Sequence, residues 1–332
     1  MRRELLAVVV AVVSAAVALF AQGRGGQAPV LEITQVRGDL YYVSGGANTV
    51  FLITPEGIIL GDPVSTAQGT WLKPELERRF NKPVRYVVYS HHDFDHAEGA
   101  AAFGTGPQVV AHENAAKNLD GKLHRLAGGN LDTNNNGKLD RGEASGGYVP
   151  NFDRLDRNHD GAIAPDELNQ EIRKPDITYT GRRILTLGGK TVELIHPGRN
   201  HSDDMTVMYF PAERAVLAVD FIFPGTTPPV WAEYDWTPLR EWIASIKAVE
   251  ALDFDILIPG HGRRLGTRAD VVANREFLED VLAAVSKGIA EGKSLEELKR
   301  TVTLEKYAMW PNLATGRLSH IEHAYNNLRH YP

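Results

Sequence analysis

The sequence predicts an α/β fold in which short strands and longer helices alternate in two halves of the chain. Strand and helix patterns occur together in residues 30–116 and again in residues 176–330. A polar insert, residues 117–175, separates the halves and is rich in Asp, Asn, Gly and Arg. The balance of 43% hydrophobic and 23% charged residues is typical of a globular protein, which excludes a disordered chain, collagen and a coiled coil.

Length, charge and cysteine content narrow the functional classes. A chain of 332 residues is long enough for one large domain or two ordinary ones. Its net charge of −6, from 36 basic and 42 acidic residues, offers no broad basic field for nucleic acid or for an anionic membrane. Because the chain has no cysteine, disulfides, thiolate nucleophiles, iron–sulfur clusters and cysteine zinc modules are excluded. No pattern in the sequence sets an oligomeric state.

Residues 1–21 are predicted to be a secretory signal peptide. Arg2 and Arg3 precede an apolar run from Leu5 to Phe20, and small, polar residues follow Ala21. A charged start, a short apolar run and a small-residue exit are typical of such signals. The alternatives are a buried helix or an uncleaved anchor, although a membrane span needs about 20 apolar residues. Cleavage after Ala21 would give a secreted or periplasmic protein without membrane attachment.

The first half is predicted to begin with four strands and to continue with helices between further strands. The four strands are Leu31–Val36, Leu40–Val43, Thr49–Ile53 and Gly57–Leu60, separated by glycine and proline turns. A helix over Trp71–Phe80, a strand over Val84–Tyr89, a helix over Ala97–Phe103 and a strand over Val109–Ala111 follow. The strand ending at Tyr89 runs directly into a cluster of histidines and aspartates.

The second half repeats this alternation of strands and helices. Its predicted strands are Ile184–Leu187, Thr191–Ile195, Met205–Phe210, Ala215–Val219 and Asp255–Ile258. Its predicted helices are Pro238–Leu252, Ala269–Glu291, Ser294–Thr301 and Leu318–Leu328. The strand over residues 255–258 stands between two long helices, as expected for a short buried strand.

Histidines and aspartates stand at four places where predicted strands end. The residues are His91, Asp93, Asp95 and His96 in one motif, His201 in a second, Asp220 at the end of an apolar strand, and His261 in a Pro-Gly-His-Gly turn. Imidazoles and carboxylates on strand-end loops can converge on a metal cluster. Each place alone is typical of a surface hydrogen bond or a turn cap, and only the ordered set indicates a metal centre.

The ordered set resembles the signature of the metallo-β-lactamase fold superfamily. That signature is H-x-H-x-D-H, then a His, a bridging Asp and a final His. The sequences Gly57-Ile-Ile-Leu-Gly-Asp62, Val216-Leu-Ala-Val-Asp220 and Ile258-Pro-Gly-His-Gly262 also resemble the family's forms. The resemblance implies a four-layer αββα sandwich, in which two sheets pack between helices, with the polar segment as a small helical insert.

The resemblance also implies a role for each residue. His91 and His201 match ligands of a first metal ion, and Asp95, His96 and His261 match ligands of a second. Asp220 matches the aspartate that bridges both ions, and Asp62 matches a supporting position behind the ligands. True β-lactamases of the family lack the bridging aspartate, so the resemblance favours another hydrolase.

The sequence departs from the family's pattern at two positions. Asp93 stands where the family usually has its second His, and the adjacent His92 is shifted by one residue and is expected to point elsewhere. The first site is then His91, Asp93 and His201, a harder ligand set that would favour manganese or iron over zinc, or would weaken that site. Glu98 replaces a usual glycine of the following turn.

The implied chemistry is hydrolysis of a small-molecule substrate by a metal-bound hydroxide. Two divalent ions lower the pKa of a water between them, and Asp95 is the predicted catalytic residue that orients this water. Esters, lactones, thioesters and phosphodiesters are the expected substrates, and zinc is the default metal. One alternative is a non-catalytic calcium- or ligand-binding protein on a degenerate scaffold of this family. Another is a redox di-iron protein, although the chain has no obvious flavin-binding segment.

The insert carries a second pattern of oxygen-bearing residues, which occurs twice. A first loop runs from Asp132 to Glu143 and a second loop from Asp156 to Glu167. The predicted calcium ligands are Asp132, Asn134, Asn136, Lys138, Asp140 and Glu143 in the first loop, and Asp156, Asn158, Asp160, Ala162 and Glu167 in the second. The spacing resembles a pair of EF-hand calcium loops, with Gly137 and Gly161 at the sharp turn. Leu139 and Ile163 are expected to pair across the loops.

The pattern of the insert leaves its role open. A polar Asn/Asp turn explains any short piece of it, but two full twelve-residue matches favour calcium. A bound calcium could be a structural clamp, a gate over the metal centre or part of a docking surface. The structural clamp is the preferred interpretation, because a bound ion stabilises the folded state by simple linkage.

Overall fold

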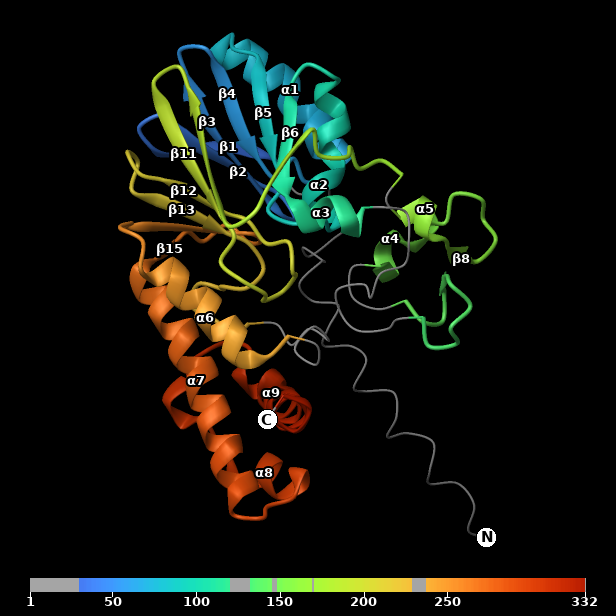
Figure 1. Cartoon of the computed structure of the whole chain (residues 1–332), viewed down its shortest axis with the longest axis vertical. Helices are drawn as coiled ribbons and strands as arrows, with labels where there is room; N and C mark the ends of the chain where they lie inside the picture. Colours follow the sequence, from blue (N-terminus) through green and yellow to red (C-terminus); the bar gives the residue numbers. More distant parts are fainter. Residues whose placement is uncertain (1–29, 120–131, 145–147, 169, 229–236, 332) are drawn as a thin grey trace.

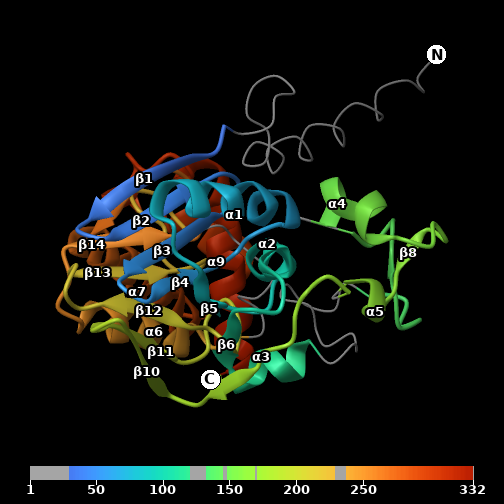
Figure 2. The same cartoon turned by 90° about the horizontal axis from the view of Figure 1, so that it is seen from above.

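Two β-sheets pack face to face and helices cover their outer sides, as Figures 1 and 2 show. The computed structural model describes residues 30–119, 132–144, 148–168, 170–228 and 237–331. Helices α1 and α3 lie beside the first sheet, and α6 and α7 lie along the second (Figure 1). The predicted four-layer sandwich of helix, sheet, sheet and helix is therefore confirmed. The predicted signal peptide lies outside the described residues.

The first sheet has the strand order β1-β2-β3-β4-β5-β6-β9. The strands are β1 (Glu32–Arg37), β2 (Leu40–Ser44), β3 (Asn48–Thr54), β4 (Gly57–Gly61), β5 (Val84–Val88), β6 (Gln108–His112) and β9 (Ile177–Tyr179). Strands β4, β5, β6 and β9 are parallel to one another, so each step needs a crossover connection. These crossovers are α1 (Thr66–Phe80), then α2 (Phe94–Ala97) with the 3₁₀ helix η3 (Glu98–Phe103), then α3 (Glu113–Asn118) followed by the insert.

The second sheet has the strand order β10-β11-β12-β13-β14-β15. The strands are β10 (Arg182–Leu187), β11 (Lys190–Ile195), β12 (Val207–Phe210), β13 (Ala215–Ala218), β14 (Ile256–Pro259) and β15 (Gly266–Thr267). The helices are α6 (Leu239–Glu250), α7 (Arg268–Ala290), α8 (Leu295–Thr301) and α9 (Leu313–His330), with a 3₁₀ helix η5 (Glu305–Tyr307). Strands β13 and β14 are parallel, and α6 lies in the connection between them.

Side chains of the central strands alternate between two apolar cores. In β3, Val50 and Leu52 are fully buried in the core shared with the second sheet, whereas Phe51 between them is buried in the core shared with α1. This alternation follows from the two-residue period of a strand, and burial on both faces explains the nearly continuous apolar sequence. Trp242 of α6 is fully buried against the second sheet. Its Nε1–H donates to the Phe221 carbonyl.

Most predicted elements are present, with differences in length and in the shortest strands. The first helix begins at Thr66 instead of Trp71, because the Ser65 side chain accepts a hydrogen bond from the Gln68 N–H and caps it. The short strands β9 and β15 and the helix α3 were not predicted, since two- to six-residue segments carry little periodicity. Within the part of the chain that the structure describes, no helix is long and apolar enough to cross a membrane.

The insert forms its own two-stranded sheet and packs on the first sheet's helices. It contains β7 (Leu139–Asp140), α4 (Tyr148–Leu155), β8 (Ala162–Ile163) and α5 (Pro165–Leu168). Strands β7 and β8 are antiparallel and place Leu139 opposite Ile163, so the predicted pairing of these two residues is confirmed. In both views α4 and α5 stand beyond α2 and α3, away from the second sheet (Figures 1 and 2).

Candidate metal centre

The seven residues predicted to bind metal converge at one end of the two sheets. They follow the carboxyl ends of β5, β13 and β14 and the end of β11, because parallel strands present their carboxyl ends at the same edge. Three groups have ligand atoms within 4.8 Å of one another: His91, Asp93 and His201; His91, His96 and Asp220; and Asp95, His96 and His261. The sequence motifs therefore come together in space as the resemblance implies.

The first group places one carboxylate between two imidazoles. The Asp93 Oδ2 atom lies 3.3 Å from His91 Nε2 and 3.2 Å from His201 Nε2. The adjacent His92 turns away, and its Nδ1 lies 3.2 Å from an oxygen of the buried Asp204. The expectation that His92 points elsewhere is correct, and Asp93 takes the place in the first group.

The second group joins two imidazoles and a more open carboxylate. The Nε2 atoms of His96 and His261 are 3.3 Å apart, and Asp95 Oδ2 lies 3.7 Å from each of them. The Asp95 side chain is 43% exposed, whereas that of His96 is fully buried. Asp95 is therefore the acidic member of the cluster that incoming water and substrate reach most easily.

Asp220 lies between the two groups. Its Oδ2 is 3.9 Å from the Nε2 atoms of His91 and His201 and 3.2 Å from His96 Nε2. Its Oδ1 is 3.2 Å from His261 Nε2. The Asp220 backbone has a φ of 60°, a left-handed conformation that an aspartate tolerates better than most residues.

The glycine before His261 makes room for Asp220. A Cβ atom at Gly260 would lie 2.5 Å from Asp220 Oδ1 and 2.6 Å from a Val219 methyl group. Any larger side chain would displace the carboxylate that faces both groups. The Pro-Gly-His turn thus delivers an imidazole and leaves space for Asp220.

The cluster fits divalent cations. His91 Nε2 and Asp220 Oδ1 are buried and lack a hydrogen-bond partner. Asp93 nevertheless lies near the first atom, and His261 lies near the second. Burial alone would raise the pKa of Asp220, but the neighbouring His261 and His96 hold that pKa well below its usual range. Asp220 likewise raises the pKa of His96 against the effect of burial. Imidazoles and carboxylates crowded in this way attract positive charge. Divalent ions bound there would replace the protons that the histidines otherwise take up.

Asp62 and Ser90 orient the histidines toward the centre. Asp62 Oδ1 accepts from the Ser90 N–H at 2.7 Å, and Asp62 Oδ2 accepts from the Ser90 hydroxyl at 2.7 Å. His96 Nδ1 lies 3.0 Å from Asp62 Oδ2, and His91 Nδ1 lies 2.9 Å from Ser90 Oγ. Because the hydroxyl proton goes to Asp62, His91 Nδ1 must donate, which leaves the Nε2 lone pairs of both histidines for a metal.

The sequence motifs did not assign a role to Ser90 or to Asp204. Asp204 is fully buried, and Ser202 and His92 are its hydrogen-bond partners. Burial disfavours a charged His92, but the Asp204 carboxylate outweighs it and raises the pKa of His92 to about 9. Asp204 lies in the same loop as His201, and that short spacing was the one available signal.

The two loops of the insert share one hydrogen-bonding pattern. In the second loop Asp156 Oδ2 accepts from the Gly161 N–H at 3.0 Å, and Glu167 Oε1 accepts from the Asn158 N–H at 3.0 Å. The corresponding bonds of the first loop run from the Gly137 N–H to Asp132 and from the Asn134 N–H to Glu143. Gly137 and Gly161 have positive φ angles of 84° and 89°, the conformation for which the position needs glycine.

Other predicted calcium ligands in the loops have partners of their own. The Asp140 Oδ2 atom accepts from the side-chain amides of Asn134 and Asn136. The Lys138 ammonium lies 2.6 Å from Asp160 Oδ2, where both side chains are about two-fifths exposed. An exposed lysine can leave such a pair at little cost.

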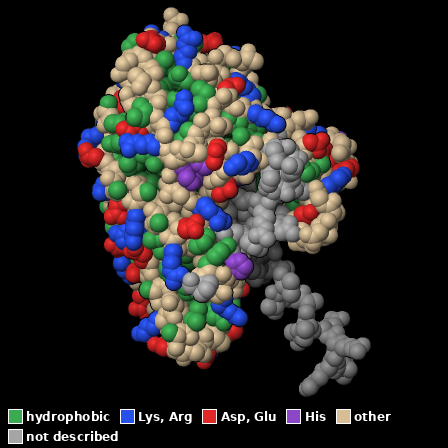
Figure 3. All heavy atoms as spheres, in the orientation of Figure 1, with side chains coloured by type: hydrophobic (Ala, Val, Ile, Leu, Met, Phe, Trp, Pro, Cys, Tyr) green, Lys and Arg blue, Asp and Glu red, His purple; other side chains and the backbone are tan. Residues whose placement is uncertain are grey.

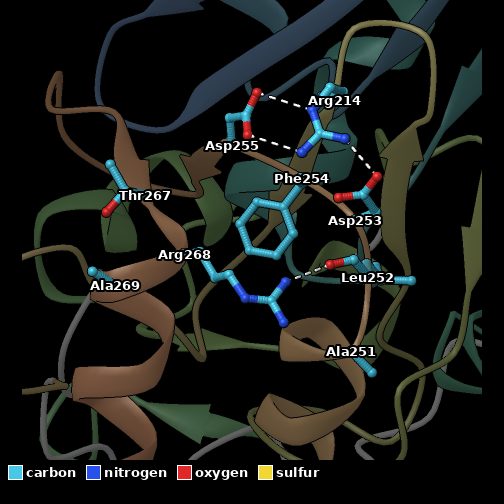
Figure 4. A pocket seen from close by; sticks show the side chains of 9 residues that line it. All are labelled: Arg214, Ala251, Leu252, Asp253, Phe254, Asp255, Thr267, Arg268 and Ala269. Atoms are coloured by element: carbon cyan, nitrogen blue, oxygen red, sulfur yellow. Dashed lines mark hydrogen bonds and ion pairs between the residues drawn. The ribbon is translucent and has the colours of Figure 1, made fainter.

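A separate surface hollow of about 580 Å³ lies at the other end of the second sheet (Figure 4). Its lining includes the residues before β13 and β14, whereas the metal cluster follows these strands. Arg214 pairs there with Asp253 and Asp255, and Arg268 donates to the Leu252 carbonyl. Because its cations are already engaged and it lies far from the cluster along the strands, this hollow is not the candidate active site.

The visible surface carries both signs of charge in a mixed pattern. Figure 3 shows lysine and arginine side chains interspersed with aspartate and glutamate over the sheets, the long helices and the insert. This face has no continuous basic patch.

Comparison with known proteins gives relatives of similar size and of about twice the size. The chain is 24% identical over 273 residues to the 2,4-dinitroanisole O-demethylase subunit alpha of Nocardioides sp., covering 81% of this chain and 68% of the relative. It is 25% identical over 287 residues to the linear primary-alkylsulfatase of Pseudomonas sp., covering 83% and 52%.

A solved structure and a family match complete the comparison. The stereoselective inverting sec-alkylsulfatase of Pseudomonas sp. aligns with a TM-score of 0.60 at 16% identity, covering 89% of this chain and 50% of that one. The chain thus spans about half the length of either alkylsulfatase. Residues 43–261, more than half of the chain, match the family described as the metallo-beta-lactamase superfamily. The protein belongs to the metallo-β-lactamase superfamily.

Proposed function

We propose that the protein is an exported, metal-dependent hydrolase that cleaves an ester-like bond in a small molecule. The observation that carries the proposal is the pair of ligand groups joined by Asp220, in which seven imidazole and carboxylate side chains face one another. Membership of the superfamily and similarity to an alkylsulfatase support a metal-dependent hydrolase in general. The substrate class, the metal and export go beyond that support.

The proposed first site consists of His91, Asp93 and His201, and the second of Asp95, His96 and His261. Asp220 would contribute to holding both cations, because its carboxylate faces both groups. Zinc is the default choice, whereas the carboxylate of Asp93 would favour a harder ion such as manganese or iron in the first site. Metal analysis of the purified protein by mass spectrometry would identify both ions.

The chain's own groups would prepare the reaction in three ways. When bound, the divalent cations supply a water nucleophile at neutral pH and positive charge for the substrate oxygen. Asp95 would accept a hydrogen bond from the attacking water and orient it, because its carboxylate is the most exposed one at the cluster. Asp62 and Ser90 hold the histidines in the orientation that presents Nε2. His92 and the buried Asp204 keep Asp93 in place from the opposite side.

The substrate panel follows from this chemistry and from the relatives. Esters, lactones, thioesters and phosphodiesters all expose an electrophilic centre to a water nucleophile. Alkyl sulfates and 2,4-dinitroanisole are added because the similar proteins are an alkylsulfatase and an O-demethylase subunit. Turnover of one class by protein loaded with zinc, manganese or iron would identify the reaction.

The decisive variant is Asp220→Asn, which removes the charge shared by the two sites. We expect kcat/KM to fall at least about 100-fold, with loss of at least one bound metal ion. Asp253→Asn, on the distant exposed end of the sheet, is the matched control and should keep full activity. If no substrate is turned over while two cations are bound, the protein is a non-catalytic binding protein on this fold.

We further propose that the two loops of the insert bind calcium. The shared hydrogen-bonding pattern of the loops and the pairing of β7 with β8 support this assignment. Titration calorimetry should detect calcium binding, and Glu167→Gln should weaken the second site at least about tenfold, or 1.4 kcal/mol. The exposed neighbour Asp166→Asn is the control. The assignment would be refuted if the protein bound calcium no more tightly than magnesium. It would also be refuted if Glu167→Gln and Asp166→Asn bound calcium with equal affinity.

Export is proposed from the residues before the described fold. The predicted signal peptide, residues 1–21, would be removed during secretion to the periplasm or the medium. Amino-terminal sequencing of the exported protein should begin at Gln22. Recovery of the intact Arg2–Phe20 segment from the membrane fraction would instead support an anchor.

A further inference from the structure

The insert makes a half-buried ion pair beside the candidate metal ligands. Glu98 follows His96 by two residues, and only 4% of it is exposed. Its Oε1 atom lies 2.5 Å from Nη1 of Arg154, which belongs to α4 of the insert. The Arg154 side chain is 42% exposed, whereas the Glu98 carboxylate is buried and therefore requires a partner. Glu98, which replaces a glycine of the family's pattern, thus has its partner in the insert.

The same helix of the insert also packs on the residue between two candidate ligands. Phe94 separates Asp93 from Asp95 and is 9% exposed. The Arg154 guanidinium lies 5.7 Å from the centroid of the Phe94 ring, and the ring of Tyr148 lies 5.6 Å from it. The helix α4 therefore contacts Phe94, the first residue of α2, and Glu98, the residue that follows α2.

A second connection reaches the ligand segment from the start of α1. Glu171 accepts from the Thr66 hydroxyl at 2.9 Å and pairs with Arg157 at 2.5 Å. Just before Thr66, the Val64 N–H donates to the His96 carbonyl at 3.0 Å. The two arginines, Arg154 and Arg157, flank Asp156, the first residue of the second loop.

We propose that Arg154 and Glu98 are positioning residues for the metal centre, and that the second loop and the metal centre are energetically coupled through them. The pair fixes α2, and with it Asp95 and His96, against the insert. A cation in the second loop would order the end of α4 that presents Arg154. By linkage, each cation would then raise the affinity for the other by the same factor. The inference rests on the proposed metal centre, and its second part rests on the proposed calcium loop.

The first test measures zinc affinity without calcium. Competition with a chromophoric chelator should give at least about tenfold weaker zinc binding for Arg154→Gln, because α2 loses its anchor. Arg154→Lys keeps the charge and should restore part of the affinity. Arg78→Gln is the control, since Arg78 pairs with Glu75 on the exposed face of α1. Circular dichroism verifies that each variant is folded.

A double-mutant cycle distinguishes positioning from general destabilisation. Glu98→Gln and Arg154→Gln should each weaken zinc binding, and the double variant should be no worse than either, because both remove one interaction. Additive losses, or zinc affinity equal to the parent in Arg154→Gln, would overturn the role of the pair. If Arg154→Gln does not fold, Arg154→Lys and Glu98→Gln decide on the same criterion.

The second test measures coupling between calcium and zinc. In the parent protein, saturating calcium should strengthen zinc binding several-fold, and zinc should strengthen calcium binding by the same factor. In Arg154→Gln calorimetry should still detect calcium while the coupling is lost. Independent affinities in the parent would overturn the coupling. A parent that binds no calcium would refute the loop assignment alone, and one that binds no zinc would refute the metal centre itself.

Discussion

Two aspartates with left-handed backbone conformations hold the candidate centre together. Asp62 has a φ of 49° and Asp220 a φ of 60°, and each follows the end of a strand. Such conformations cost about 1 kcal/mol or more and persist where the surrounding structure fixes them. Asp220 faces both groups of candidate ligands, and Asp62 accepts hydrogen bonds behind them. Two of the described residues with a positive φ are therefore the ones that organise the candidate centre.

Replacing Asp62 by alanine should damage both stability and metal binding. The Ser90 N–H and hydroxyl and the His96 Nδ1–H would lose their acceptor, and each buried orphan group costs about 1–3 kcal/mol. Zinc affinity should fall about 10- to 100-fold, because the orientation of His96 is no longer fixed. Urea denaturation and zinc competition measure the two effects. Asp39→Ala, at an exposed ion pair with Lys190, is the control and should change neither stability nor zinc affinity. Unchanged zinc affinity in Asp62→Ala would contradict the orienting role of Asp62.

At the scale of residues, the sequence motifs predicted the members of the cluster and Asp62 behind them, but not Ser90 or Asp204. The order of His91, His96, Asp220 and His261 along the chain is fixed by the motif, so it could be read directly. Ser90 and Asp204 act through partners that only the fold brings near. A serine that precedes a histidine, as Ser90 does, cannot be recognised as a supporting residue from sequence alone. Its role follows from its hydrogen bond to Asp62, which only the fold reveals.

Helix α1 and the 3₁₀ helix η3 approach each other closely at two glycines. A Cβ atom at Gly99 would lie 2.3 Å from the Pro63 carbonyl oxygen and 2.6 Å from that of Ser65. A Cβ atom at Gly69 would lie 2.6 Å from the Gly99 carbonyl oxygen. These contacts are with backbone, which cannot move aside as a flexible side chain can. The close approach places the turn after His96 on the loop that carries Val64.

Gly99→Ala should therefore destabilise the protein by about 1–3 kcal/mol, as overpacking does in a tight core. The displaced η3 should also move His96, so zinc binding should weaken with stability. Thermal unfolding and zinc competition provide the measurements. Gly106→Ala, in open space after the same helix, is the control and should be close to neutral. A Gly99→Ala protein as stable as the parent would contradict this account of the contact.

Element prediction succeeded where a pattern was long or bounded by turns. The helix α7 differs by one residue at each end from the predicted range, since its apolar positions recur over many turns. The strands β9 and β15 were missed because they are only three and two residues long. They exist because neighbouring strands β6 and β14 offer hydrogen-bonding edges, which is information from the fold and not from the local sequence.

At the scale of the whole molecule, the insert is part of the apolar core between the first sheet and α1. Phe152, Leu155 and Ile163 are almost fully buried, in the same cluster as Leu72 of α1 and Val109 of β6. A segment that shares its core with the sheet cannot unfold without exposing apolar surface of both. Sequence composition separated the insert from the rest of the chain, but it could not predict this shared burial.

The shared core predicts one cooperative unfolding transition that calcium shifts as a whole. If calcium binds only the folded state, a concentration 100 times the dissociation constant stabilises it by about 2.7 kcal/mol. Calorimetry should then give a single peak that moves to higher temperature with calcium, and the combined fluorescence of the chain's five tryptophans should report the same midpoint. Glu167→Gln should lose at least part of the shift. Two peaks, of which only the lower responds to calcium, would mean that the insert unfolds alone, and the coupling to the metal centre would then lack its physical basis.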